Sequence, residues 1–344
     1  MYKHGGNVYQ HKDKIDFSAN INLLGMPEKV VRAACEGVMN SGQYPDPDCL
    51  ELRTEISRVT KTPKEHIICG NGAADLIFAL VLALKPARAL IPIPTFYEYE
   101  QALKTVGCEI EYVTMKEEQG FKLQEDFLAR IKKGIDIIFL CNPNNPTGNI
   151  LDKAFVKKVI QQCERNKIWL IVDECFMDFI EDSSNYSVMD YCSQITHLFI
   201  LKAFTKLYAM PGLRLGYGIC SNTELLNSMK QVLQPWNVSI PAQKAGIAAL
   251  QEKQYVKDSL EIIKKERQYL IVELQILKFK VYDSHANYIF FQAHRGLYES
   301  CLNKGILIRD CSNYPGLEEG FYRIAVKRHK DNVYLINALR EEME

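Results

Sequence analysis

The sequence lacks the spaced cysteine and histidine pairs that usually bind metal ions. Its eleven cysteines include no C-x-x-C pair, and its seven histidines include no H-x-x-x-H or H-x-x-E-H pattern. We therefore expect no metal site. Several of the cysteines lie in or beside apolar runs, where a reduced thiol behaves as a small core residue: Cys69, Cys108, Cys141, Cys175 and Cys220.

The sequence also lacks net charge, a long apolar segment and a leader-like N-terminus. The chain has 42 lysine and arginine residues and 42 aspartate and glutamate residues. It therefore has no net positive charge to attract nucleic acid or an anionic membrane. The longest apolar run, LIFALVLAL at 76–84, is far shorter than the ~20 residues that span a bilayer. The first residues show no apolar segment followed by a cleavage site. We expect a cytoplasmic protein that binds a small molecule.

The pattern of apolar runs predicts two domains. At 344 residues the chain exceeds the roughly 250 to 300 residues that one core organises. Apolar runs alternate with helical patterns up to about residue 240, which predicts an α/β domain with a mostly parallel sheet covered by helices on both faces. A long amphipathic pattern and short strands then predict a smaller α+β domain. The expected division is an N-terminal arm with part of the small domain over 1–44, a large domain over 45–245 and a small domain over 246–344. The expected strands are 87–91, 108–115, 136–141, 168–173, 197–201, 215–220, 288–291, 306–309 and 322–326.

Two cations stand between apolar runs in KAFTKLYAMPGLRLGYGIC, residues 202–220. A buried lysine is costly unless something binds it or it loses its proton. A neutral lysine reacts with an aldehyde, whereas arginine stays charged and suits a phosphate. Pyridoxal 5′-phosphate carries both groups. Lys206 and Arg214 therefore indicate this cofactor, although cations near strand ends are more often solvated surface residues.

Further candidate residues follow other expected strands, at the sheet edge where parallel sheets bind ligands. Asn145, in NPNNPTG at 142–148, could bind the cofactor's 3′-oxygen, and Asp173 could face its pyridine nitrogen. Phe96 could support the ring, and the turn GAA at 72–74 opens a helix whose amides could bind phosphate. Each feature alone has a simpler explanation as a turn, a helix cap or a core residue.

Together these motifs resemble the aspartate aminotransferase-like superfamily of pyridoxal phosphate enzymes, which have fold type I. Any one motif is common, but eight in order along nearly the whole chain are specific. The resemblance implies an enzyme that binds pyridoxal 5′-phosphate in the domain over 45–245. The motifs are YPDP at 44–47, GNG at 70–72, PTF at 94–96, NPNNPTG at 142–148, DECF at 173–176, TK at 205–206, GLRLGY at 212–217 and YRIAV at 322–326.

The resemblance also implies a role for each residue. Lys206 and Asp173 would be catalytic, the lysine bonded to the cofactor's aldehyde and the aspartate paired with its ring nitrogen. Tyr44 would reach the cofactor phosphate of a partner subunit, which implies a homodimer. The other implied cofactor-binding residues are Gly72, Ala73, Ala74 and Arg214 at the phosphate, Asn145 at the 3′-oxygen, Phe96 on the ring and Thr205 beside the lysine.

Two groups within the superfamily compete, the histidinol-phosphate aminotransferases and the threonine-phosphate decarboxylases of cobalamin biosynthesis. HGGN at 4–7, DFSANINLLG at 16–25 and ILIRDCSNYPGL at 306–317 resemble the decarboxylases. So does Phe176, since the aminotransferases have a tyrosine there that bonds the 3′-oxygen. The resemblance implies decarboxylation of L-threonine O-3-phosphate, with amino transfer as the alternative. The implied substrate-binding residues are His4, Gly5, Asn20, Asn145, Arg309 and Arg323, of which Arg323 would pair bidentately with the α-carboxylate.

Two positions depart from the superfamily pattern around the cofactor phosphate. Serine or threonine usually stands three residues before the lysine, where this chain has Ala203. A hydroxyl or acidic side chain usually follows GNG, where this chain has Ala73 and Ala74. Each lost charge-assisted hydrogen bond is worth ~1.5 to 3 kcal/mol. We expect modest cofactor affinity, with Thr205 compensating in part.

Overall fold

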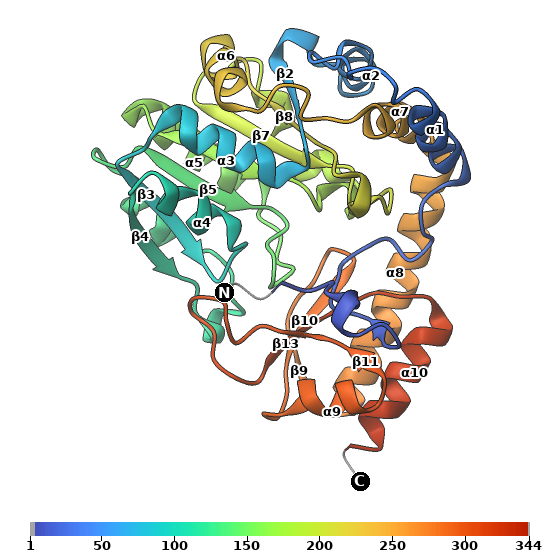
Figure 1. Ribbon diagram of the computed structural model, residues 1–344. Coiled ribbons are helices and arrows are strands. Elements are labelled where there is room, and N and C mark those ends of the chain that lie inside the picture. The colour runs from blue at the N-terminus through green and yellow to red at the C-terminus, as the bar shows by residue number, and fades with distance from the viewer. Residues whose placement is uncertain (1–3, 343–344) are drawn as a thin grey trace.

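A seven-stranded sheet forms the centre of the larger part of the computed structural model, which describes residues 4–342 (Figure 1). The strand order is β2-β8-β7-β6-β5-β3-β4. β8 runs antiparallel to β2 and β7, and the other neighbouring pairs are parallel. The predicted mostly parallel α/β sheet is confirmed, and β2 is a strand that the apolar runs did not predict. The strands are β2 (Ile67–Gly70), β3 (Arg88–Ile93), β4 (Glu109–Thr114), β5 (Ile137–Cys141), β6 (Trp169–Asp173), β7 (Leu198–Ala203) and β8 (Gly216–Ile219).

Helices cover both faces of this sheet because its central strands are apolar on both sides. In β5, Ile137 and Phe139 pack on one face and Ile138 and Leu140 on the other, as the two-residue period of a strand requires. The first face is covered by α3 (Ala73–Leu84), α4 (Glu98–Thr105) and α6 (Thr223–Val232). The second face is covered by α2 (Leu50–Thr60), α5 (Lys153–Asn166) and α7 (Ile240–Ala249), with α1 (Glu28–Met39) packed on α7.

A smaller α+β unit lies beside this sheet and combines the N-terminal segment with the C-terminal part of the chain (Figure 1). β1 (Ile15–Asp16) pairs in parallel with β11 (Ile306–Leu307), and a second, antiparallel sheet has the order β12-β13-β10-β9. The exact domain limits at residues 44 and 245 stay a prediction. The remaining elements are β9 (Lys280–Val281), β10 (Tyr288–Gln292), β12 (Arg309–Asp310), β13 (Phe321–Ala325), α8 (Lys253–Ile276), α9 (Leu297–Asn303) and α10 (His329–Arg340).

The cysteines are free thiols, and all but Cys35 are buried. Across residues 4–342, no three histidine, cysteine, aspartate or glutamate side chains are arranged to hold a metal ion. Over the same part of the chain, no helix is both long and apolar enough to cross a bilayer.

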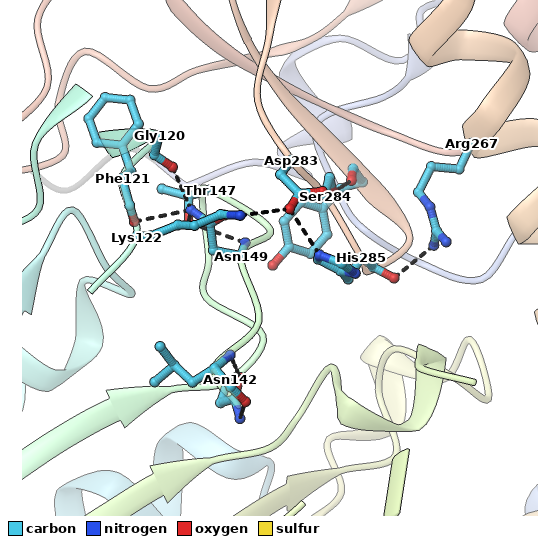
Figure 2. Close-up of polar contacts among 12 residues, drawn as sticks. Gly120, Phe121, Lys122, Asn142, Thr147, Asn149, Arg267, Asp283, Ser284 and His285 are labelled. Atoms are coloured by element: carbon cyan, nitrogen blue, oxygen red, sulfur yellow. Dashed lines mark hydrogen bonds and ion pairs between the residues drawn. The ribbon is translucent and has the colours of Figure 1, made fainter. Parts of the chain in front are cut away.

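The loop after β5 is hydrogen-bonded both to residues 120–121 of the larger part and to the smaller unit (Figure 2). The Asn149 amide donates to the carbonyls of Gly120 at 2.8 Å and Phe121 at 3.0 Å, and the His285 N–H donates to the Gly148 carbonyl at 3.1 Å. Gly148 has φ +79°, and a Cβ there would lie 2.4 Å from the Ser284 hydroxyl oxygen, so only glycine fits this approach.

The segments that contact this loop are themselves held in place. Figure 2 shows Lys122 reaching Asp283, at 3.1 Å, and Arg267 donating to the carbonyl of His285 at 2.7 Å. The loop that carries Asn145 is therefore fixed between the two parts of the molecule.

Candidate active site

A cavity of about 270 Å³ lies between the carboxyl ends of the central strands and the smaller unit. The chain brings to its walls residues from the N-terminal segment, from α3 and α4, from the loops after β5 and β7, and from β12 and β13. Almost all of the sequence-predicted site residues line it: His4, Gly5, Asn20, Ala73, Ala74, Phe96, Asn145, Asp173, Thr205, Lys206, Arg214, Arg309 and Arg323.

Two predicted residues, Gly72 and Tyr44, are not part of this lining. Gly72 directly precedes α3, and its backbone lies against the Arg214 guanidinium. Tyr44 is 74% exposed and stacks on Trp236 with ring centres 4.3 Å apart, outside the cavity of its own chain. Its contact with a partner subunit's cofactor stays a prediction.

The start of α3 and Arg214 form one end of the cavity. Gly72 has φ +87°, and a Cβ there would lie 2.4 Å from the Arg214 guanidinium, so the close approach of these two residues requires glycine. In the described chain, no side chain caps α3, so its first backbone amides remain available to an anion. Ala203, at the end of β7, lines the cavity without a hydroxyl. An arginine at a helix N-terminus suits a phosphate group.

Two lysines near the end of β7 lie in opposite environments. Lys206 lines the cavity, where burial and then the Arg323 cation lower its pKa from the usual 10.5 to about 8. Lys202 donates to Asp178 at 2.6 Å and lies 3.9 Å from Glu174. Burial alone would lower the pKa of Lys202, but Asp178, Tyr217 and Glu174 together outweigh burial and raise it. Lys206 is therefore the lysine that supplies an appreciable fraction of neutral, reactive amine near neutral pH.

Asp173 ends β6 with both carboxylate oxygens hydrogen-bonded. Oδ2 accepts from the Tyr99 hydroxyl at 2.6 Å, and Oδ1 accepts from the Cys175 backbone N–H at 2.9 Å. Burial raises the pKa of Tyr99 well above its usual value, so its hydroxyl stays a donor. Sequence reasoning missed Tyr99, whose ring meets that of Phe96 edge-on with ring centres 5.5 Å apart. These bonds fix the direction of the Asp173 carboxylate.

Arg323 and Asn145 meet in the cavity from opposite sides. Arg323 Nη1 donates to Asn145 Oδ1, and Nη2 donates to the Ser18 carbonyl at 2.8 Å. Because Oδ1 of Asn145 accepts a bond, its NH₂ group is the part that can donate to a ligand oxygen. Arg323 Nε and Asn20 Oδ1 are buried without a partner among residues 4–342, as expected of groups that await a ligand. Ser18 was not predicted, since a backbone carbonyl leaves no sequence signal.

Arg309 and His4 form a second basic corner. The Arg309 guanidinium donates to Asn313 Oδ1 at 2.8 Å and lies 5.1 Å from the centre of the Tyr314 ring. His4 Nδ1 lies 3.6 Å from Oε1 of Glu98, and burial followed by Arg309 lowers the pKa of His4. Sequence reasoning also missed Glu98, although an acidic side chain two residues after Phe96 was a visible signal.

Arg309 and Arg323 are cross-strand neighbours. Their Cα positions pair between β12 and β13, yet their guanidinium groups contact different residues. Like charges on paired strand positions destabilise a sheet unless an anion offsets them. The smaller unit therefore presents two buried cations to anionic groups of a ligand.

The polar groups of the cavity match the chemistry of pyridoxal 5′-phosphate. The α3 N-terminus and Arg214 suit its phosphate, Lys206 suits its aldehyde, and Asp173 suits its protonated ring nitrogen. The fold and the site together define a pyridoxal phosphate-dependent enzyme of fold type I.

Comparison with known proteins identifies the family. Residues 12–339 match aminotransferase class I and II, and the chain belongs to that family. A threonine-phosphate decarboxylase of Salmonella typhimurium is 36% identical, with 98% of this chain and 95% of that protein aligned. Among solved structures, the histidinol-phosphate aminotransferase from Clostridium acetobutylicum has a TM-score of 0.89 at 34% identity, covering 95% and 98% of the two chains. The L-threonine-O-3-phosphate decarboxylase from Porphyromonas gingivalis has a TM-score of 0.82 at 23% identity, covering 95% and 98%, a likeness of fold alone.

Proposed function

We propose that this protein removes the carboxylate of L-threonine O-3-phosphate, releasing CO₂ and (R)-1-amino-2-propanol O-2-phosphate for cobalamin biosynthesis. The observation that carries the proposal is the pair of buried arginines, Arg309 and Arg323, in one cavity with Lys206. A substrate with a phosphate and a carboxylate needs two cationic anchors. Binding both groups also fixes the orientation of the bond that is to be broken.

Two further observations support the decarboxylase over an aminotransferase. The Salmonella relative that is 36% identical is a threonine-phosphate decarboxylase. Phe176 is buried with its ring edge-on to Tyr288 at 5.0 Å, and it brings no hydroxyl to the cavity. The Clostridium aminotransferase, at 34% identity, keeps amino transfer from histidinol phosphate as the alternative.

The contacts of the site residues support a proposed role for each of them. Pyridoxal phosphate, when bound, supplies a ring that accepts electron density from the substrate's Cα. Arg309 binds the phosphate and Arg323 the carboxylate, which sets the direction of the bond between Cα and the carboxylate. Lys206, whose lowered pKa lets it exchange protons near neutral pH, delivers a proton to Cα in place of CO₂. Asp173, fixed by Tyr99, holds a proton at the cofactor's ring nitrogen.

The test is to give the purified holoenzyme phosphothreonine and to measure CO₂ and aminopropanol phosphate. We expect CO₂ in a one-to-one ratio with the amine product, and little conversion of the cofactor to its amine form. Rapid amino transfer from histidinol phosphate to 2-oxoglutarate, with no CO₂ from phosphothreonine, would refute the proposal and establish the alternative.

We further propose that the protein acts as a cytoplasmic homodimer, with Tyr44 of each subunit contacting the other subunit's cofactor. Free, mostly buried thiols are typical of reducing compartments and support the cytoplasmic part. Exposed apolar side chains support an interface near Tyr44, since Val38 and Met39 on α1 are 61% and 85% exposed. Sedimentation equilibrium tests the dimer.

A further inference from the structure

Glu98, the first residue of α4, faces the cavity with half of its carboxyl group unmatched. Its side chain is 16% exposed, and Oε1 lies 3.6 Å from His4 Nδ1. Oε2 is buried and has no hydrogen-bond partner among the described residues. A buried carboxyl oxygen without a partner is costly, so this atom is a candidate for a contact with a ligand in the cavity.

The surroundings of Glu98 do not favour its charged form. Burial is the largest effect and raises its pKa from 4.5 to about 7, although its own backbone N–H and nearby cations act in the opposite direction. His4 is a weak partner, because burial and Arg309 lower the pKa of that imidazole. The titratable groups that face Glu98 come from five other segments: His4, Cys141, Asp173, Lys206, Arg309 and Tyr314.

Glu98 shares its corner of the cavity with His4 and Arg309, whereas Arg323 is held by Asn145 and Ser18. An ionised Glu98 would repel a phosphate bound at Arg309. A protonated Glu98 would donate an O–H hydrogen bond to the same phosphate, because a carboxylic acid is a donor as well as an acceptor. The charge of this one side chain therefore decides whether the corner accepts a dianion.

We propose that Glu98 binds the substrate's phosphate as a neutral carboxylic acid, donating from Oε2, so that phosphate binding takes up a proton at this residue. The inference rests on the proposed function, since it requires a phosphate at the Arg309 end of the cavity. Above the pKa of free Glu98, each bound phosphate must bring a proton with it. The apparent affinity should then fall about tenfold for each pH unit above 7.

The test uses 3-(phosphonooxy)butanoate, which is phosphothreonine without its amino group and cannot react with the cofactor's aldehyde. Its binding to the holoenzyme is followed by calorimetry at pH 8 in Tris and in HEPES, because the difference in heat between these buffers counts the protons taken up. We expect about one proton per ligand for the wild type. Glu98→Gln should take up none, and its Kd should not change between pH 6.5 and 8.5.

Three controls test the assignment of the proton to Glu98 and to phosphate binding. 3-Hydroxybutanoate, which lacks the phosphate, should bind both proteins without proton uptake. His4→Gln should still take up the proton, so uptake that is lost in His4→Gln and kept in Glu98→Gln assigns the proton to His4 and overturns the inference. Glu98→Asp, which keeps an acid at this position, should retain the uptake and guards against a fold defect in Glu98→Gln.

The outcomes distinguish this inference from the function on which it rests. A ligand that binds the wild type and Glu98→Gln with equal proton uptake refutes the role of Glu98 and leaves the proposed function standing. A phosphorylated ligand that does not bind the wild type at all refutes the proposed substrate, and the inference with it.

Discussion

The rate at which the apoprotein combines with pyridoxal 5′-phosphate should rise with pH as Lys206 loses its proton. Burial and the Arg323 cation lower the pKa of Lys206 to about 8, against 10.5 for an ordinary lysine. At pH 7 the neutral fraction is then about 9%, where an ordinary lysine would have about 0.03%, a gain of about 300-fold. The second-order rate constant, measured with limiting cofactor, reports the pKa of the free protein. We expect a midpoint near pH 8.

The substitution Arg323→Gln should raise the pKa of Lys206. Removing the cation takes away one of the effects that lower the pKa of Lys206, so the midpoint should move upward. The variant should combine with the cofactor more slowly than the wild type at pH 7 but equally fast once Lys206 is neutral in both. Arg328→Gln is the matched control, because Arg328 donates to the carbonyls of Leu23 and Leu24.

The assay is the absorbance of the bound cofactor after stopped-flow mixing between pH 6.5 and 9.5. A midpoint of the wild type above pH 10 would refute the reasoning, since the site would then give Lys206 no advantage over a surface lysine. Borohydride reduction and peptide mapping complete the test, because the reduced cofactor must be found on Lys206. Cofactor on Lys202 would contradict the ion pair with Asp178 that keeps that amine charged.

Three further outcomes are expected. Ala203→Ser should tighten cofactor binding by about 1 kcal/mol, or about fivefold in Kd, if its hydroxyl reaches the phosphate; equal cofactor retention on dialysis would count against this. Arg309→Ala and Arg323→Ala should each lower kcat/KM for phosphothreonine by at least ~100-fold, corresponding to a charge-assisted contact of ~3 kcal/mol. The free energy of unfolding of the Glu98→Gln apoprotein, measured relative to that of the wild-type apoprotein, should increase as pH rises. Because the pKa of Glu98 goes from 4.5 to about 7 on folding, the wild type loses stability across that interval. We expect a loss of about 3 kcal/mol, measured by urea unfolding. A difference between the two proteins that is the same at pH 4.5 and at pH 8 would disprove it.

The large sheet could be predicted because central parallel strands are apolar on both faces. Runs such as DIIFLC and IWLIVD are therefore unambiguous in the sequence. β2 was missed because it has only four residues, Ile67–Gly70, and leads directly into a glycine turn. The run at 306–309 reads as one strand, but the chain changes sheets at Ile308, so that β11 pairs with β1 and β12 with β13. A change of partner leaves no trace in local composition.

The candidate site was predictable where a residue follows a strand, and not where its surroundings come from distant segments. Asp173 and Asn145 stand at strand ends, so their place in the cavity follows from sheet geometry. Tyr99 bonds Asp173 from 74 residues away, and the Ser18 carbonyl meets Arg323 from 305 residues away. Those contacts depend on how segments far apart in the sequence pack together within each part of the molecule.

Lys202 and Lys206 cannot be told apart by local sequence alone. Both follow the same apolar run four residues apart, both are desolvated, and each would look like a candidate for the cofactor. The difference between the two pKa values arises from the charged side chains that lie close to each amine. Glu174 and Asp178 lie beside Lys202 and hold it charged, while Lys206 meets the cation of Arg323 instead. Exchanging these surroundings would exchange the reactivity of the two lysines, because an amine is a nucleophile only in its neutral form and close carboxylates favour the charged form.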